Sequence, residues 1–265
     1  YPQIVRQCYR PLARMAERLQ LPLGLEMSAY TLQVINSLDP SLVKRLRRLW
    51  EEGLCEVIGS GYVQSVMPLI PARVNRENLK RGNAVFEQLL GRRPLLAFVN
   101  EQVYSAGLPA LYREAGYQGI MVNWDSSLAR RADPGLLYHP CSVSTGDGGR
   151  MPVLWHSQAA SYEFQHCAWS RISLESFVSG LASHIHECEP RSYPLYTSDW
   201  EVFDFKPWHP YPEGFSQPAF TEMDRVSQVF GMIKEQAGLE LVSPSALLAQ
   251  ASQMPAVRLE DSACP

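Results

Sequence analysis

The 265-residue sequence lacks several features that mark particular classes of protein. No apolar run approaches the roughly 20 residues of a membrane-spanning helix, so we expect no membrane partner. The net charge of −3 leaves no excess of basic residues, which disfavours nucleic acid as a partner. No GxGxxG or P-loop motif follows a predicted strand, which disfavours nucleotide-binding folds.

The six cysteines lack CxxC spacing and most stand beside apolar residues. In a chain of this size they are typical of buried, reduced thiols, so we expect a cytoplasmic protein. His184, His186 and Cys188 lie in one predicted helix, where residues two apart point in different directions and cannot share a metal. We therefore expect neither metal nor cofactor. The sequence does not predict the oligomeric state.

What the sequence does contain is an alternation of apolar strand-like and amphipathic helix-like segments. Strands are predicted over residues 21–28, 54–62, 94–101, 117–125, 151–157, 193–201 and 239–242. Residues 126–150 form a polar, glycine-rich excursion. About seven β/α repeats with strands of parallel-sheet character fit either a doubly wound sheet or a barrel. We expect one α/β domain over residues 1–252 and a loosely held tail over 253–265.

The sequence opens in a helix, although in a β/α protein each helix follows a strand. This order suggests that a first strand is missing from the chain.

Polar residues gather at the carboxyl ends of the predicted strands, the edge at which β/α barrels place their chemistry. These ends carry Glu26, Tyr62, Glu101, Trp124, Asp125, His156, Asp199, Trp200 and Glu201. Packing does not require polar strand ends, so their convergence predicts an enzyme. Carboxylates and aromatic rings without lysine, arginine or cysteine suit a neutral, polyhydroxylated substrate. Glycoside hydrolysis needs a pair of carboxyl groups, and Glu101 and Asp199 are the best-placed pair.

Four segments of the sequence are similar to the motifs of one enzyme family. AFVNEQVYS (97–105) is similar to the nucleophile motif of that family, and YTSDWEVFDF (196–205) to its acid motif. CEVIGSGYVQSVMPLIP (55–71) and LGLEMSAYTLQVI (23–35) are similar to two further motifs. The family that these segments resemble is glycoside hydrolase family 57. The resemblance runs in order from about residue 8 to 205. It implies a distorted (β/α)7 TIM-like barrel, a retaining mechanism and, typically, α-glucan substrates.

Carried over to this sequence, the resemblance implies that Glu101 is the nucleophile and Asp199 the general acid/base. It also implies that Glu201 accompanies them and that Tyr62 and Tyr104 line the site. Each catalytic residue has a structural role as the alternative. Glu101 could cap the following helix or pair with an arginine, and Asp199 could cap the loop. We also interpret Glu26, Trp124, Asp125, His156 and Trp200 as substrate-binding residues, with packing or a structural histidine as the alternatives for Trp124, Trp200 and His156.

The leading hypothesis is a retaining glycosidase or transglycosylase acting on an oligo- or polysaccharide. A second hypothesis is a carbohydrate-binding or regulatory barrel that has lost turnover. A third is a metal-dependent polysaccharide deacetylase, which shares a related barrel, but no HxxxH pair occurs at a strand end. In each case we expect carbohydrate to be the partner.

Overall fold

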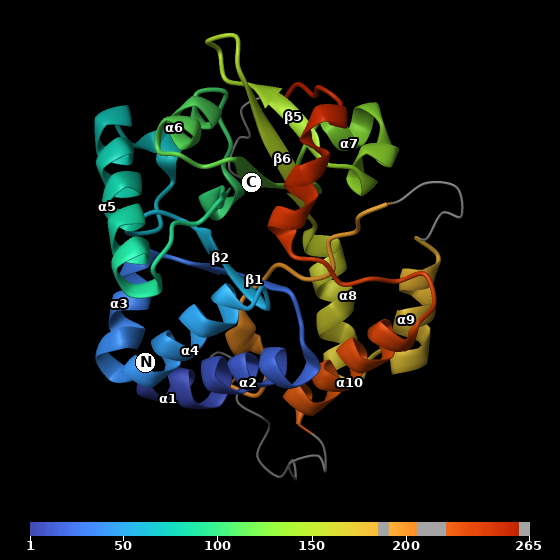
Figure 1. Cartoon of the computed structure of the whole chain (residues 1–265). Helices are drawn as coiled ribbons and strands as arrows, with labels where there is room; N and C mark the ends of the chain where they lie inside the picture. The colour runs from blue at the N-terminus through green and yellow to red at the C-terminus, as the bar shows by residue number, and fades with distance from the viewer. Residues whose placement is uncertain (185–190, 206–220, 260–265) are drawn as a thin grey trace.

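The computed structural model describes residues 1–184, 191–205 and 221–259, with a sheet at its centre (Figure 1). The six strands of this sheet lie in the order β1-β2-β3-β4-β6-β5, and all neighbours are parallel except the β5–β6 pair. Their bounds are β1 Leu23–Met27, β2 Cys55–Gly59, β3 Leu96–Phe98, β4 Gly119–Asn123, β5 Cys141–Ser144 and β6 Arg150–His156. The predicted α/β fold with a mostly parallel sheet is confirmed.

Helices connect the strands and surround the sheet. The α-helices are α1 Pro2–Ile4, α2 Arg10–Leu19, α3 Ala29–Leu38, α4 Pro40–Glu51, α5 Ala72–Leu90, α6 Leu108–Glu114, α7 Ala129–Ala132, α8 Gln158–Ala168, α9 Leu174–Ala182 and α10 Glu222–Glu235. Between α1 and α2 lies a π-helical segment, η1 (Val5–Tyr9), and shorter 3-10 segments include η3 (Asn100–Gln102), η5 (Trp200–Val202) and η6 (Pro244–Gln253). Figure 1 shows α2 to α5 on one side and α8 to α10 on the other.

The outer face of the sheet packs against these helices. Around β1 and β2 the core includes Val57 with residues of α2 to α5 and α8 to α10. Around β3, β4 and β6 it includes Val99, Ile120 and Val153. Successive residues of a strand point to opposite faces, so the residues between these lie on the inner face.

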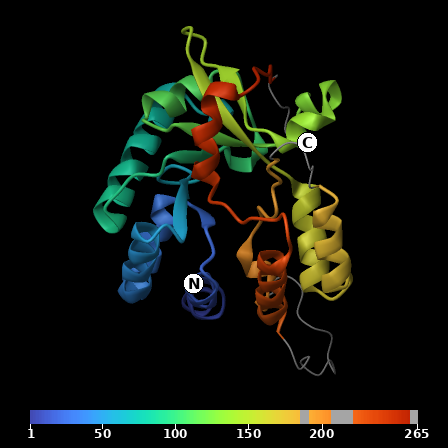
Figure 2. The same ribbon diagram turned by 45° about the vertical axis from the view of Figure 1, so that its right-hand side comes forward.

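The inner face is filled by a small cluster of Ile58, Leu96, Met121 and Leu154, against which Leu247 and Leu248 of η6 pack. Figures 1 and 2 show η6 in red, running across the strands. Two strand positions facing η6 are glycines: a Cβ at Gly24 would lie 2.8 Å from Pro244, and one at Gly119 2.8 Å from Leu248. η6 therefore closes one end of the inner face, and the carboxyl ends of the strands open at the other.

Two predicted strands are absent. Residues 193–199 form no strand, 200–202 belong to η5, and 239–242 form no strand either. Pro194 supplies no backbone N–H for a sheet ladder, which disfavours strand pairing in the first of these segments. Both segments instead line the cavity described below.

The predicted polar excursion contains structure of its own. Its glycine-rich stretch turns the chain between β5 and β6, where Asp147 accepts a hydrogen bond from the backbone N–H of Gly149 at 3.1 Å. Part of the predicted loose tail is attached to this hairpin: Val257 donates a backbone hydrogen bond to Ser142 at 2.9 Å, and Met254 and Leu259 are buried. The sequence prediction missed this hairpin.

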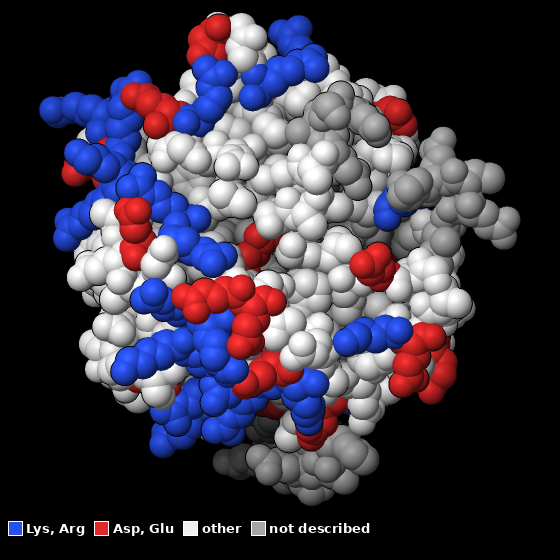
Figure 3. All heavy atoms as spheres, viewed as in Figure 1, with Lys and Arg blue, Asp and Glu red and all other residues white. Residues whose placement is uncertain are grey.

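Cys8, Cys55, Cys141 and Cys167 are free and buried, and Cys188 and Cys264 lie outside the described residues. Among the helices that the structure describes, none combines the length and apolar character of a membrane span. Figure 3 shows basic side chains gathered on the side of α4 and α5, with acidic ones among them. Ion pairs such as Arg47–Glu51 and Arg93–Glu87 partly neutralise this side.

Candidate active site

The parallel strands bring polar residues to one edge of the sheet. Asn123 of β4 is in register with His156 of β6, and Met27 of β1 with Gly59 of β2. Glu26 shares the inner face with Gly24, and His156 shares it with Leu154, because residues two apart in a strand point the same way. The alternation of the strands therefore turns Glu26 and His156 toward the same interior.

A cavity of about 1200 Å³ opens along this interior. Five of the ten predicted site residues line it: Glu26, Glu101, Asp199, Trp200 and Glu201. Tyr62, Tyr104, Trp124, Asp125 and His156 are not part of its lining. The cavity is thus lined by the two carboxylates predicted to react, by Glu201, which was predicted to accompany them, and by Glu26 and Trp200, which were predicted to bind substrate.

Glu101 sits in a strained backbone just after β3. Its φ is 53° and that of Gln102 is 60°, two consecutive left-handed residues that are not glycine. Such conformations cost free energy and cluster at functional sites. Within the described residues the Glu101 carboxylate has no hydrogen bond or ion pair, so it neither caps α6 nor pairs with an arginine. Its exposed side chain faces the cavity unpaired.

Asp199 begins η5 without capping it, and its carboxylate is likewise without a hydrogen bond in the part of the chain that is described. Its backbone carbonyl accepts a hydrogen bond from the Tyr196 hydroxyl at 2.8 Å. Trp200 packs edge-on against Phe203, with 5.1 Å between ring centroids. Backbone and neighbouring rings therefore fix this turn and leave the Asp199 carboxylate open to the cavity.

Glu26 shows that the acidic residues act on one another. Burial raises the pKa of its carboxyl, and the charges of Asp199 and Glu101 raise it further. A hydrogen bond from the Gln64 amide, 3.2 Å from the Glu26 carboxylate, opposes this rise in pKa. Charge repulsion is effective over short distances in a protein. The charges of both carboxylates of the predicted catalytic pair therefore act on the Glu26 carboxyl in the shared cavity.

His156 of β6 lies on the inner face of the sheet and is 1% exposed. Its ring lies against that of Phe98, which lines the cavity, with 4.8 Å between centroids. Burial lowers the pKa of His156 to about 4, although the charge of Asp125 opposes the shift. Neither ring nitrogen has a hydrogen-bond partner among the described residues. His156 is thus a neutral imidazole with unused donor and acceptor capacity.

Asp125 has a structural role that the sequence did not indicate. Its carboxylate accepts hydrogen bonds from the backbone N–H groups of Gln158 at 2.6 Å and Ala159 at 3.3 Å, and from the Ser157 hydroxyl at 3.2 Å. It therefore holds the first turn of α8. Trp124 is buried against Trp155, with 5.1 Å between centroids, so packing accounts for its position.

The two tyrosines taken from the family resemblance lie outside the cavity lining. The Arg81 guanidinium stands 4.0 Å from the centre of the Tyr62 ring, and Tyr104 is buried in the core around β3 and β4. Their predicted contact with substrate stays a prediction.

Two cavity residues escaped the sequence prediction. Tyr9 of η1 donates a hydrogen bond to the Glu201 carboxylate, and Gln64 donates to Glu26. Tyr9 stands 192 residues before its partner, so no motif could connect them. Gln64 lies inside the 55–71 segment quoted above and could have been found there as a polar residue near a strand end.

Possible metal ligands do not gather in the described residues: no group of three or more His, Cys, Asp or Glu side chains is placed to hold an ion. His184 instead contacts the Tyr138 hydroxyl through Nδ1 at 2.7 Å. His186 and Cys188 lie outside the described residues.

Residues 1–252 match the family described as Glycosyl hydrolase family 57. The chain belongs to this family. The match extends from α1 to the last turns of η6, so it includes every strand of the sheet and both predicted catalytic carboxylates.

Solved structures agree with this assignment of the fold. The chain resembles a 4-α-glucanotransferase from Thermococcus litoralis with a TM-score of 0.76 and 18% identity, covering 97% of this chain and 38% of that one. It resembles the α-amylase AmyC from Thermotoga maritima with a TM-score of 0.75 and 11% identity, covering 100% of this chain and 72% of that one. The predicted barrel-like α/β architecture is therefore confirmed.

A curated relative in sequence is alpha-amylase 1 of Dictyoglomus thermophilum, 22% identical over 116 residues. That match covers 43% of this chain and 17% of the amylase. The chain thus spans well under half the length of both this amylase and the glucanotransferase.

Proposed function

We propose that this family 57 chain is a retaining glycosidase or transglycosylase that acts on an α-glucan. The observation that carries the proposal is the pair of unpaired carboxylates, Glu101 and Asp199, on one cavity and close enough to Glu26 to raise its pKa. The family membership supports glycosidic chemistry. The choice of an α-glucan as substrate is supported by the relatives of this chain, which include an α-amylase and a 4-α-glucanotransferase.

The first step of the proposed reaction forms a glycosyl-enzyme ester. A carboxylate oxygen of Glu101 attacks the anomeric carbon while the bond from that carbon to the glycosidic oxygen breaks. The carboxylic acid of Asp199 gives its proton to the leaving oxygen. The strained backbone at Glu101 holds the nucleophile at a fixed point of the cavity rim.

The second step releases the sugar. The Asp199 carboxylate removes a proton from water, or from a hydroxyl of another sugar, as that oxygen attacks the anomeric carbon and the ester bond to Glu101 breaks. Two inversions at the same carbon retain its configuration. The side-chain amide of Asn100, which lines the cavity and whose Oδ1 is unpaired among the described residues, is suited to bind a sugar hydroxyl.

The proposal is tested by comparing a glucan with a glycosyl fluoride, because fluoride leaves without a proton. We expect Glu101→Gln to lower kcat/KM on both maltoheptaose and maltosyl fluoride by at least about 10³-fold. Asp199→Asn should lower it by roughly 10²–10⁴-fold on maltoheptaose and far less on the release of fluoride. Glu77→Gln, on the exposed surface of α5, is the matched control and should match wild type.

Equal losses on the two substrates in Asp199→Asn would refute its role as the acid. A wild-type chain that binds maltoheptaose but turns over neither substrate would instead support the carbohydrate-binding alternative.

A further inference from the structure

The first helical segment carries a cavity residue that the proposed reaction does not yet use. Tyr9 lines the cavity, and its hydroxyl donates a hydrogen bond to Oε1 of Glu201. Burial and this hydrogen bond raise the pKa of Tyr9, so the hydroxyl keeps its proton at every physiological pH. Tyr9 is therefore a permanent donor to Glu201. In the described part of the chain it is the one donor to that carboxylate.

An irregular turn places Tyr9 there. Pro11 has no backbone N–H, so the helix cannot form the regular bond back to residue 7. The chain widens into the π-helical turn Val5–Tyr9, in which the Arg10 N–H reaches the carbonyl of Val5. Such π-turns inside helices recur at functional sites.

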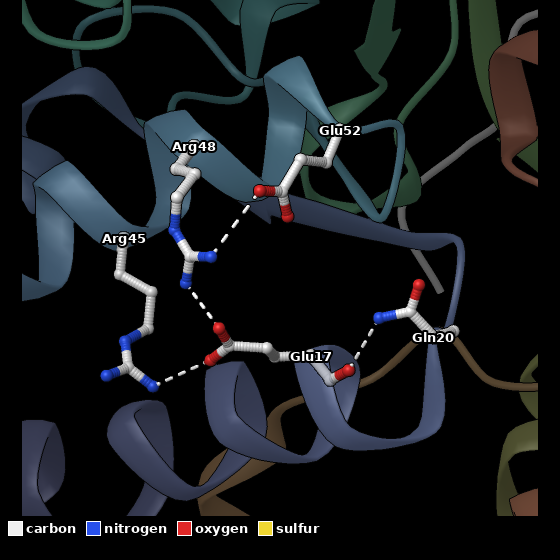
Figure 4. Close-up of polar contacts among 5 residues, drawn as sticks. All are labelled: Glu17, Gln20, Arg45, Arg48 and Glu52. Atoms are coloured by element: carbon white, nitrogen blue, oxygen red, sulfur yellow. Dashed lines mark hydrogen bonds and ion pairs between the residues drawn. The ribbon is translucent and has the colours of Figure 1, made fainter.

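Helix α2, which follows this turn, is anchored by ion pairs at its first residue and near its end. Arg10 pairs with Asp39 at 2.5 Å, and this contact helps lower the pKa of the buried Asp39 carboxyl to about 2. Farther along α2, Glu17 bridges Arg45 and Arg48 of α4, as Figure 4 shows. These contacts hold Tyr9 in place while it reaches across to η5.

We infer that Tyr9 is a positioning residue: it holds the Glu201 carboxylate in the cavity so that the second oxygen of that carboxylate accepts a sugar hydroxyl. One oxygen of Glu201 is occupied by Tyr9, and the other has no partner among the described residues. Tyr196 holds the backbone of the same turn at Asp199. The turn is thus fixed at two points, one of them supplied by η1. This inference rests on the proposed carbohydrate substrate.

The test measures the binding of maltoheptaose in a variant that cannot turn over substrate, so the result does not depend on catalysis. In the Glu101→Gln background, calorimetry with maltoheptaose is expected to show about tenfold weaker binding for Tyr9→Phe, the cost of losing one hydrogen bond to a charged group. Tyr30→Phe is the matched control, since Tyr30 is 50% exposed and lies outside the cavity lining; it should leave the affinity unchanged.

A double-mutant cycle separates positioning from a general structural effect. Glu201→Gln should weaken binding, and adding Tyr9→Phe to it should weaken binding no further, because Tyr9 acts through Glu201. Unchanged affinity in Tyr9→Phe, additive losses, or no maltoheptaose binding in the Glu101→Gln background would each overturn the inference.

The same variants distinguish this inference from the proposed reaction. A wild-type chain without turnover, combined with non-additive losses of affinity, would leave Tyr9 assigned and remove the reaction. Turnover in wild type, combined with additive losses of affinity in the variants, would support the proposed reaction and remove the role assigned to Tyr9.

Discussion

The imidazole of His156 lies against the ring of Phe98, with 4.8 Å between centroids and 32° between planes. This packing buries a titratable group on the inner face of the sheet and lowers its pKa from 6.5 to about 4. In the unfolded chain the histidine takes up a proton near its ordinary pKa of about 6.5. Between these two values the unfolded state binds more protons than the folded state, so stability rises with pH.

The wild-type chain should therefore lose about 3 kcal/mol of unfolding free energy from His156 alone as the pH falls from 7 to 4. His156→Leu should remove this part of the pH dependence, because leucine fills the site without titrating. Urea unfolding of both proteins at pH 7 and pH 4 measures the difference. His166→Gln, at a histidine near the end of α8, is the control and should keep the wild-type slope. The same slope in His156→Leu would contradict the account.

For Glu26 we predict a pH dependence of stability with the opposite sign. Burial and the charges of Asp199 and Glu101 raise the pKa of its folded-state carboxyl, so its ionisation destabilises the fold. Stability from this group is full below the unfolded pKa and is lost as the pH rises through the folded pKa. We expect Glu26→Gln to become more stable relative to wild type between pH 4 and pH 8, and to lose glucan turnover. Urea midpoints at the two pH values test this, with Glu87→Gln on the surface of α5 as control.

The role of Asp125 separates a helix cap from a substrate contact. Asp125→Ala should lower the unfolding free energy by about 1 kcal/mol, because the first N–H groups of α8 lose their acceptor. The KM for maltoheptaose should stay within about twofold if the cap is its main role. A KM raised tenfold at unchanged stability would show instead that Asp125 binds substrate, as the sequence analysis predicted.

The packing of η6 against the inner face of the sheet requires a glycine at position 119 of β4. A methyl group at Gly119 would lie 2.8 Å from both Leu248 and Leu96, so Gly119→Ala should cost about 1–3 kcal/mol by forcing η6 away from β4. Gly231 in α10 has open space around the added methyl group, and Gly231→Ala should stabilise the chain by about 0.5–1 kcal/mol. Urea unfolding of the pair checks the contrast, and equal effects would show that η6 does not pack as described.

The features predicted best from sequence are those that local pattern determines. One run of apolar residues is followed by Asn123 and another by Glu101. Parallel strands bring these polar residues to the same edge of the sheet, whatever the register between the strands. Helix α5 ends at Gly91, whose φ is 78°, and a glycine that follows an amphipathic run is a local signal for the end of a helix.

Other features depend on contacts between distant residues. Asp125 and Glu101 look alike in sequence, since each follows a strand, yet only Asp125 meets the N–H groups of α8. The segment 193–201 has strand-like residues, but a strand forms only where a neighbouring strand is available for pairing. The local sequence does not show whether such a neighbouring strand is present. Tyr9 lies in the widened turn η1 beside Pro11 and donates to Glu201, a partner 192 residues later in the chain.

Covalent trapping tests the central claim most directly. Maltotriosyl fluoride should load the Asp199→Asn chain quickly, because fluoride needs no acid, and the ester should persist because the base is missing. Mass spectrometry is expected to find one maltotriosyl group on the peptide that contains Glu101, and none on the Asp199→Asn, Glu101→Gln double variant. Release of fluoride without a sugar on Glu101, or a sugar attached to another residue, would contradict the account.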